Sequence, residues 1–455
     1  MPYTTASGDS FERAGRLSHS AAAIQAMADR TEFFVPADAL ADADWIRECV
    51  VPKSELAGAV LDPALESAIA VDGSHVTQQV RDGMPSVLYG FTQAAAAYVD
   101  LGAMTEQSKA KFVDPVEMER AISTALVTID MPVSGAFTRP DVDIKTSWRE
   151  LMNRIFREKF VEVDGYKHSL LELLFKLHGT PSGAADVVPV NCPGCDVKDL
   201  DIEVDGMRCP NCQIDLYPTD TLRIHEGVQE DTGNEAALGR LRSVIELLVL
   251  VGLSTLLWER SRTELLPKTL FIQDGPLAMY GEPAKLRARA EKYFRAMSNT
   301  TPGDGPFICG IEKSGTFVDY GRQLARHDLV LPGELVICGE PILERLVSTN
   351  DAKAYGKETY WGRKFIYRSL DGRVVVITVP PESGSAYDAR GGQPGPDGYP
   401  TLPAILDVID RTGSSMYQDG VIPVAAAHGR AAFPIGVGTD VLRLVAREKL
   451  GLTNN

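Results

Sequence analysis

Short apolar runs that end at polar turns mark several strands along the chain. Runs within 65–76 and 269–273 both lead into an Asp-Gly pair, and a third run occupies 307–311. An apolar run of four to eight residues that is closed by a turn residue is typical of a buried strand. The pattern therefore predicts strands that deliver Asp72 and Asp274 to turns at one edge of a sheet.

Further strands and helices are predicted from residue type and periodicity. The segment 86–101 is rich in β-type residues, and the runs at 365–369 and 374–379 flank Asp371-Gly372, which predicts a hairpin. Apolar residues at helical spacing predict helices over 116–127, 147–178, 234–260, 403–410 and 439–450. Residues 383–399 are rich in Gly, Pro and Asp and predict a loop.

This alternation of strands and helices predicts an α/β fold with a mixed sheet and flanking helices. We expect an N-terminal extension over 1–60 and the first part of a core with a helical insertion over 61–180. An inserted segment of distinct composition follows over 181–230, and the second part of the core with C-terminal helices over 231–455. No internal repeat is evident.

Composition is that of a soluble globular protein, with 44% apolar and 24% charged residues and a net charge of -16. Such acidity argues against a protein that coats DNA by surface charge alone, but it leaves room for a nuclease whose basic residues line one groove. The first twenty residues lack the apolar segment of a secretory signal, and the apolar stretch 247–258 is too short to span a membrane. We expect a cytoplasmic protein without membrane contact, whose three scattered cysteines are reduced.

The most specific motif consists of two Cys-x-x-Cys pairs. Cys192 and Cys195 form the first pair, Cys209 and Cys212 form the second, and thirteen residues separate the pairs. Four thiolates can close a tetrahedral zinc site with no open position, which predicts a structural zinc ribbon with a small hairpin between the pairs. A redox role is disfavoured because neither pair opens a helix of a thioredoxin-like unit.

A third acidic residue of interest is Glu246, the only charge in the apolar helix over 243–258. A helix that is apolar on nearly all sides is buried, so its carboxylate must be paired, protonated or bound to a metal ion. Pairing with Arg242, one turn earlier, is the plainer alternative. Glu259 competes for the same role but stands at the helix end, where a solvated surface pair is expected.

The order strand–Asp, helix–Glu, strand–Asp is the layout of ribonuclease H-like nucleases. In that layout three acids hold two divalent cations roughly 3.5–4 Å apart, which activate water and stabilise the leaving oxygen. Oxygen ligands suit Mg²⁺ or Mn²⁺. Each Asp-Gly pair taken alone is as well explained by an ordinary turn.

The chain resembles the NurA nucleases. The matching segments are AVDGS at 70–74, FIQDGPL at 271–277, CGIEKSG at 309–315 and PVAAAH at 423–428, in the family's order. The resemblance implies a ribonuclease H-like fold with a Piwi-like elaboration. It also implies Mn²⁺- or Mg²⁺-dependent processing of DNA ends, for repair or phage defence, by a homodimer that works with a hexameric HerA-type ATPase translocase.

The resemblance also assigns roles to individual residues. Asp72, Glu246 and Asp274 would be the metal ligands, and His428 would match a late histidine that acts as ligand, proton donor or phosphate contact. The chain departs from the family in its four-cysteine segment, in a longer interval between Glu246 and Asp274, and in Gly420. That glycine stands where the family has a tyrosine, with Tyr417 as the nearest substitute.

Basic residues near these motifs are candidate phosphate contacts. Lys313 follows the strand in CGIEKSG, and Arg322 and Arg326 lie one turn apart on the next predicted helix. Arg240 and Arg242 occur early in the long apolar helix. Each of these is equally well explained as a solvated surface side chain.

Two other functions stay open on the sequence alone. The chain could be an inactive nuclease fold that binds DNA or protein through its zinc ribbon, or a metal-dependent phosphoesterase that acts on RNA or nucleotides. No phosphate-binding Gly-x-x-x-x-Gly-Lys-Ser/Thr loop is present, so ATP-driven motion is not expected of this chain.

Overall fold

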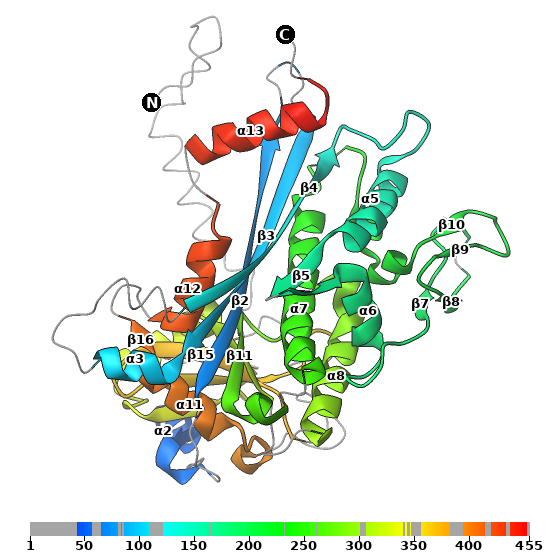
Figure 1. The fold of residues 1–455 in the computed structure, drawn as a ribbon. Helices are drawn as coiled ribbons and strands as arrows, with labels where there is room; N and C mark the ends of the chain where they lie inside the picture. Colours follow the sequence, from blue (N-terminus) through cyan, green and yellow to red (C-terminus); the bar gives the residue numbers. More distant parts are fainter. Residues whose placement is uncertain are drawn as a thin grey trace, which may run out of the picture. The chain divides into compact units, whose positions relative to one another are not determined.

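The computed structural model divides the chain into residues 1–41 and a larger compact unit, residues 42–455. The residues it describes all lie in the larger unit: 43–56, 65–80, 83, 86–108, 122–163, 165–195, 197–231, 233–260, 263–300, 306–339, 342–343, 346, 356–382, 395–414, 420–433 and 437–452. This unit is a mixed α/β structure in which helices flank a large sheet (Figure 1).

The sheet has nine strands within the described residues. Their spatial order is β1 (Val50–Pro52), β13 (Glu334–Ile337), β14 (Arg363–Arg368), β15 (Val374–Val379), β12 (Phe307–Glu312), β11 (Thr269–Asp274), β2 (Ser67–Gln79), β3 (Leu88–Asp100) and β4 (Ile122–Ser134). The central strands β12, β11 and β2 are parallel to one another. All other neighbouring strands are antiparallel.

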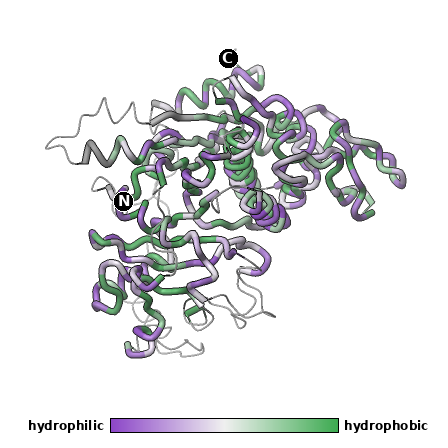
Figure 2. Tube along the Cα trace, turned by 60° about the horizontal axis from the view of Figure 1, so that its bottom comes forward, coloured by the Kyte–Doolittle hydropathy of each residue, from purple (hydrophilic) through white to green (hydrophobic). Residues whose placement is uncertain are grey.

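Strand residues alternate between two apolar cores, one on each face of the sheet. Ile69, Val71 and Phe271 belong to the core that includes the buried side of α7 (Glu235–Glu259). Ala68 and Ala70 belong to the opposite core, with α11 (Leu402–Arg411) and α12 (Ile422–Ala431). Figure 2 shows hydrophobic residues concentrated along the strands and the central helix.

Helix α7 confirms the predicted long apolar helix. It runs from Glu235 to Glu259 and is long and apolar enough to cross a membrane by composition alone, but 72% of its most apolar window is buried inside the protein. An all-apolar helix in a soluble fold is a core helix. Its low amphipathicity thus reflects burial between the sheet and α5 (Ile144–Glu158), α6 (Leu170–His178) and α8 (Leu286–Thr300).

Several predicted elements differ from the structure. Asp72 and Gly73 do not form a turn, because β2 continues through them for six more residues, paired with β3. The helix predicted over 116–127 is wrong from residue 122 onward, where β4 begins, and 116–121 lies outside the described residues. The tertiary pairing of β4 with β3 overrides its local helical pattern.

The predicted helical region 147–178 is interrupted by a hairpin. Strands β5 (Phe160–Val163) and β6 (Tyr166–Ser169) pair between α5 and α6. Ser169 then caps α6, because its side chain accepts from the Glu172 N–H while the Glu172 carboxylate accepts from the Ser169 N–H. The hairpin 365–379 and the strands before Asp274 and Glu312 are confirmed.

Part of the predicted N-terminal extension belongs to the sheet. Residues 43–48 form α2 (Ala43–Glu48), and β1 pairs with β13 at the sheet edge. At the other end of the chain α13 (Val437–Lys449) packs by Ala446 against Tyr89 and Phe91 of β3. Most of the predicted loop 383–399 lies outside the described residues.

The segment with the paired cysteines forms two small hairpins instead of the single hairpin predicted between the pairs. Strands β7 (Val188–Val190) and β8 (Leu200–Ile202) flank the first pair, and β9 (Met207–Arg208) and β10 (Asp215–Leu216) flank the second. Its buried side chains, including Ile202 and Leu216, join the same core as α5 and α7. The segment is therefore packed onto the main unit.

Candidate functional site

The candidate site lies where two of the parallel strands end and the third continues. The last β11 residue paired with β2 is Gln273, opposite Val71, and β11 ends one residue later at Asp274. Beyond Val71, β3 is the one strand that pairs with β2 among the described residues. Asp72 and Asp274 thus occupy adjacent strands at the carboxyl edge, the usual place for ligands in open α/β sheets.

Asp72 is held by its own backbone and by α12. Its Oδ1 accepts from the Gly73 N–H at 2.7 Å, and its Oδ2 lies 2.6 Å from His428 Nδ1. The end of α12 is fixed to the sheet because the Ser74 hydroxyl donates to the Ala431 carbonyl. The amide of Gln93 likewise donates to the Arg430 carbonyl at 2.6 Å. Helix α12 thereby places His428 on the same face as Asp72.

Asp274 completes a compact group of ligand atoms. One ligand atom each from Asp72, Asp274 and His428 lie within 4.8 Å of one another. Lys313 forms an ion pair with Asp274 Oδ2 at 2.8 Å. Burial, followed by repulsion from Asp72, raises the pKa of Asp274 despite that lysine. A site that crowds one buried and one partly buried carboxylate favours a cation between them.

Glu246 approaches from the opposite face of the sheet. Asp72 and Gly73 point to opposite faces because consecutive strand side chains alternate, and a Cβ at Gly73 would lie only 2.4 Å from Glu246 Oε1. Glu246 is not in the group of atoms within 4.8 Å. Its carboxylate takes the space that a side chain at residue 73 would fill.

Burial dominates the electrostatics of Glu246. Burial is the largest cause that raises the pKa of this carboxyl to about 8; Arg242 opposes the shift, and the charges of Asp72 and Asp274 add to it. Arg242 NH1 lies 3.5 Å from Glu246 Oε1 and also donates to the Gly73 carbonyl at 2.8 Å. The charges of both aspartates therefore act on the Glu246 carboxyl across β2, which has no side chain at residue 73.

Glu259 lies elsewhere and is a surface residue, as the plainer interpretation expects. Its carboxylate accepts from Lys176 at 2.5 Å and lies 2.8 Å from His168 Nε2, with 31% of its side chain exposed. Of the two glutamates considered for the third acid, only Glu246 is near the aspartates.

The predicted phosphate contacts separate into two groups. Lys313 reaches the site through Asp274. Arg322, on α9 (Thr316–Arg326), donates to the Lys313 carbonyl at 3.3 Å and pairs with Asp319. It therefore holds the backbone of Lys313. Arg326 is exposed at the far end of α9. Tyr417 lies outside the described residues, and Gly420 starts the short strand β17 (Gly420–Val421).

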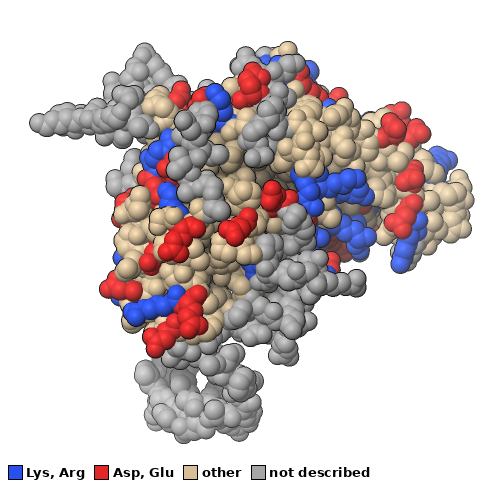
Figure 3. All heavy atoms as spheres, turned by 90° about the horizontal axis from the view of Figure 1, so that it is seen from below, with Lys and Arg blue, Asp and Glu red and all other residues tan. Residues whose placement is uncertain are grey.

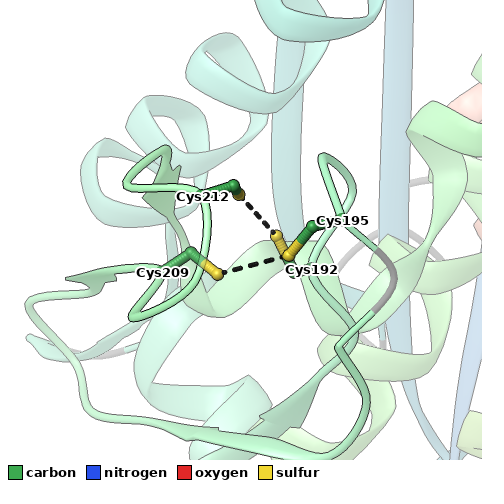
Figure 4. A group of neighbouring side chains, drawn as sticks. All are labelled: Cys192, Cys195, Cys209 and Cys212. Carbon is green, nitrogen blue, oxygen red and sulfur yellow. Dashed lines mark hydrogen bonds between the residues drawn. The ribbon is translucent and has the colours of Figure 1, made fainter.

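The four cysteines form a second group that could hold a metal ion. The Sγ atoms of Cys192 and Cys212 are 3.5 Å apart, and those of Cys195 and Cys209 are 3.6 Å apart (Figure 4). Ligands on a tetrahedral centre with bonds of about 2.3 Å are separated by about 3.8 Å, so the spacing fits such a centre. Each pair lies between the two strands of its own hairpin, and the hairpins face each other.

Sequence reasoning did not find two residues that shape this region. Gly73 admits Glu246 to the site, whereas its Asp-Gly context predicts only a turn. His75, two residues further along β2, lies against Gly239 of α7, where an added Cβ would be 3.5 Å from the imidazole ring. The signal for both was period-two alternation through Asp72-Gly73, which continues the strand.

No protein-family model, curated protein or solved structure matches this chain.

Proposed function

We propose that this protein is a divalent-metal-dependent DNA nuclease with a ribonuclease H-like core, similar to the NurA nucleases. The observation that carries the proposal is the convergence of Asp72, Asp274 and His428 within 4.8 Å, although 356 residues separate the first from the last. The strand–Asp, helix–Glu, strand–Asp order supports it, because the two strands are parallel neighbours and Glu246 approaches Gly73, next to Asp72, from the other face of the sheet.

The residues present fit a divalent cation. Two carboxylates and an imidazole suit Mn²⁺ as ligands. Mg²⁺ prefers oxygen ligands, so the carboxylates alone would suit it. Burial and mutual repulsion raise the pKa of Asp274 and of Glu246, and a bound cation would favour their ionised forms. When bound, such cations would supply an activated water molecule and stabilise the leaving oxygen of a phosphodiester.

The side chains of the site have separate tasks in this proposal. Asp72 and Asp274 hold the cation. His428, 55% exposed and hydrogen-bonded to Asp72, faces the solvent side, where it can bind a phosphate oxygen or donate a proton. Lys313 neutralises Asp274 in the free protein and contacts the phosphate when a cation takes its place. Buried Glu246 lies next to Gly73 on the other face of the sheet, and its protonation state would change the net charge near the site.

The test uses labelled linear DNA with Mn²⁺ or Mg²⁺. Asp72→Asn and Asp274→Asn each remove a charged oxygen without changing shape, and we expect cleavage to fall by about 100-fold or more. Glu259→Gln is the matched control, because Glu259 is an acid of α7 away from the site, and it should retain activity. Equal cleavage by wild type and Asp72→Asn would overturn the proposal.

A second candidate function is an inactive nuclease fold that binds DNA or protein. It is favoured by the basic partner that each acid already has, His428 for Asp72, Lys313 for Asp274 and Arg242 for Glu246. Gly420 in place of the family's tyrosine points the same way. This function predicts DNA binding without cleavage in the same assay. Matched RNA and nucleotide substrates test the remaining alternative, a phosphoesterase of a different substrate class.

Zinc in the four-cysteine cluster, a homodimer, a HerA-type translocase partner and a cytoplasmic location complete the proposal. The four-thiolate donor set supports zinc, and no disulfide joins any of the seven cysteines, all of which lie in the described residues, which fits a reducing compartment. Dimer and translocase rest on the resemblance alone. Light scattering of the purified protein tests the dimer, and co-purification with a HerA-type ATPase tests the partner.

A further inference from the structure

A large groove lies beside the four-cysteine segment and is not used by the proposed catalytic site. Its volume is about 1140 Å³, and its walls come from the start of α5, from the two cysteine hairpins, from the segment 217–226 and from Lys285. Asp72, Asp274, Glu246, His428 and Lys313 do not line it. It is therefore a separate feature that needs its own explanation.

The groove is basic in a protein that is acidic overall. Seven Lys and Arg residues line it against five Asp and Glu residues, whereas the whole chain carries a net charge of -16. Lys145, Lys198 and Lys285 are exposed in three different walls, and none has an ion pair with a carboxylate of the described residues. Figure 3 shows Lys and Arg side chains gathered where the four-cysteine segment, at the right of the view, meets the rest of this face.

One buried polar group in the wall lacks a partner. His225 is 4% exposed and lines the groove, and its Nδ1 has no hydrogen bond within the described residues. The nearest carboxylate oxygen, on Asp220, is 3.9 Å away. A buried nitrogen without a partner is costly, so a ligand or an ordered water molecule is expected beside it.

The walls are held rigidly. Arg149 is buried and donates to both carboxylate oxygens of Asp220, at 2.8 and 2.7 Å, and to the Asp215 carbonyl at 2.6 Å. The guanidinium carbon of Arg149 lies 5.3 Å from the centre of the Tyr217 ring, which also lines the groove. This network joins α5 to the second cysteine hairpin, so the groove is preorganised.

We propose that this groove binds the phosphate backbone of single-stranded DNA. A positively charged groove with an aromatic side chain is the arrangement that proteins use to bind unpaired strands. Separated lysines match successive phosphates, and Tyr217 offers a surface for a base. The choice of DNA rests on the proposed nuclease function, while the anionic character of the ligand rests on the groove alone.

The experiment measures binding without cleavage. Full-length protein carrying Asp72→Asn, with no added Mg²⁺ or Mn²⁺, is titrated into a fluorescent oligothymidine of about 15 nucleotides. Anisotropy is recorded between about 50 and 200 mM salt. The test variant combines Lys145→Glu, Lys198→Glu and Lys285→Glu. The matched control combines Lys167→Glu, Lys268→Glu and Lys449→Glu, which change the net charge equally outside the groove.

We expect the test variant to bind the single strand at least ~10-fold more weakly than the control variant. Its salt slope should fall by about 2, because each lost phosphate contact removes about 0.7 from the slope. Thermal unfolding of both variants verifies that they are folded. Equal affinity of test and control variants, or a loss confined to duplex DNA, would overturn the proposal.

A small phosphodiester substrate separates this proposal from the nuclease proposal. Bis(p-nitrophenyl) phosphate is too small to need the groove, so with Asp72 intact its Mn²⁺-dependent hydrolysis should be equal in test and control variants. Hydrolysis with unchanged strand affinity rejects the groove and keeps the nuclease. Weakened strand binding without hydrolysis of any substrate rejects the nuclease and keeps an anion-binding groove.

Discussion

At the residue scale, the environment of Glu246 is unusual for a carboxylate. It is 4% exposed, and its one close basic partner, Arg242, divides its contacts between the carboxylate and the Gly73 carbonyl. Desolvation therefore outweighs pairing, and the protonated form is favoured in the folded protein. Because the Glu246 carboxyl can ionise, it makes the stability of the protein depend on pH.

The pH dependence has a definite sign. The folded-state pKa of Glu246, about 8, lies above its ordinary value of 4.5, so its stabilisation is complete below pH 4.5 and is lost as the pH rises toward 8. We expect the free energy of unfolding of the protein without Mg²⁺ or Mn²⁺ to fall over this range. The fall should be smaller in Glu246→Gln, as measured by urea unfolding.

Glu259→Gln is the control for this measurement. Partial burial acts to raise the pKa of Glu259, but hydrogen bonds and charges from Lys176 and His168 lower it overall. Its contribution is present at high pH and lost on acidification, opposite in sign to that of Glu246. An identical pH profile in wild type and Glu246→Gln would show that Glu246 does not titrate as inferred.

Sequence could indicate the residues of the site but not their contacts. Asp72 and Asp274 are marked by the apolar runs that lead into them, and His428 is indicated only through the family resemblance. The ion pair of Lys313 with Asp274 depends on the register of β11 and β12. Register between distant strands is a tertiary property and has no local signal.

At the element scale, β2 carries the site because it continues past the end of its neighbour β11. Its open stretch leaves space at Gly73, which Glu246 fills. Sequence predicted the strand and missed its length, since Asp-Gly is a strong local turn signal. The thirteen-residue pairing of β2 with β3 overcomes that preference.

Adding a methyl group at residue 73 tests this arrangement. In Gly73→Ala the new Cβ would meet Glu246 Oε1 at 2.4 Å, so the glutamate must move. We expect a loss of about 1–3 kcal/mol in stability, as for other overpacked sites, together with reduced cleavage. Gly183→Ala, where a Cβ meets nothing within 4 Å, should change neither chemical unfolding nor activity.

The pair of Arg149 and Asp220 is the link between α5 and the cysteine hairpins. Both side chains are buried, at 7% and 0% exposed. Arg149→Met leaves the aspartate charge buried and unpaired, so we expect a loss of about 3–5 kcal/mol in chemical unfolding. The double variant Arg149→Met with Asp220→Asn should recover part of it.

A surface pair between a residue that precedes α5 and a residue of α5 provides the comparison. Arg139 pairs with Glu150, but the arginine side chain is 55% exposed. Arg139→Met should leave chemical unfolding nearly unchanged, because exposed ion pairs contribute little to stability. If Arg149→Met and Arg139→Met lost the same stability, burial would not explain the contribution of the Arg149–Asp220 pair.

At the scale of the whole molecule, the four-cysteine cluster is part of the main core. Cys192 and Cys209 pack with residues of α5, α6 and α7. Sequence predicted the metal-binding motif from its spacing, but not this packing, which depends on apolar residues between and after the pairs. The mixed α/β class and its flanking helices were predicted because their periodicities are strong. The sheet order was not, because it depends on pairing between distant segments.

Loss of one cysteine should therefore affect the entire unit. We expect Cys212→Ser to lose its zinc and to unfold at a lower temperature in one cooperative transition, because a structural zinc contributes of order 10 kcal/mol. Metal analysis and calorimetry check this. Cys49→Ser, outside the cluster, should retain one zinc per chain, and a zinc-free wild type of unchanged stability would contradict the expectation.

Asp72 and Asp274 at the carboxyl edge, and Glu246 on the other face of the sheet, each already have a basic side chain within reach. Metal uptake at the proposed site would then be an exchange in which the Lys313 ammonium gives way to the incoming ion. A protein built this way would stay folded when metal is scarce, and its activation would follow the concentration of free metal.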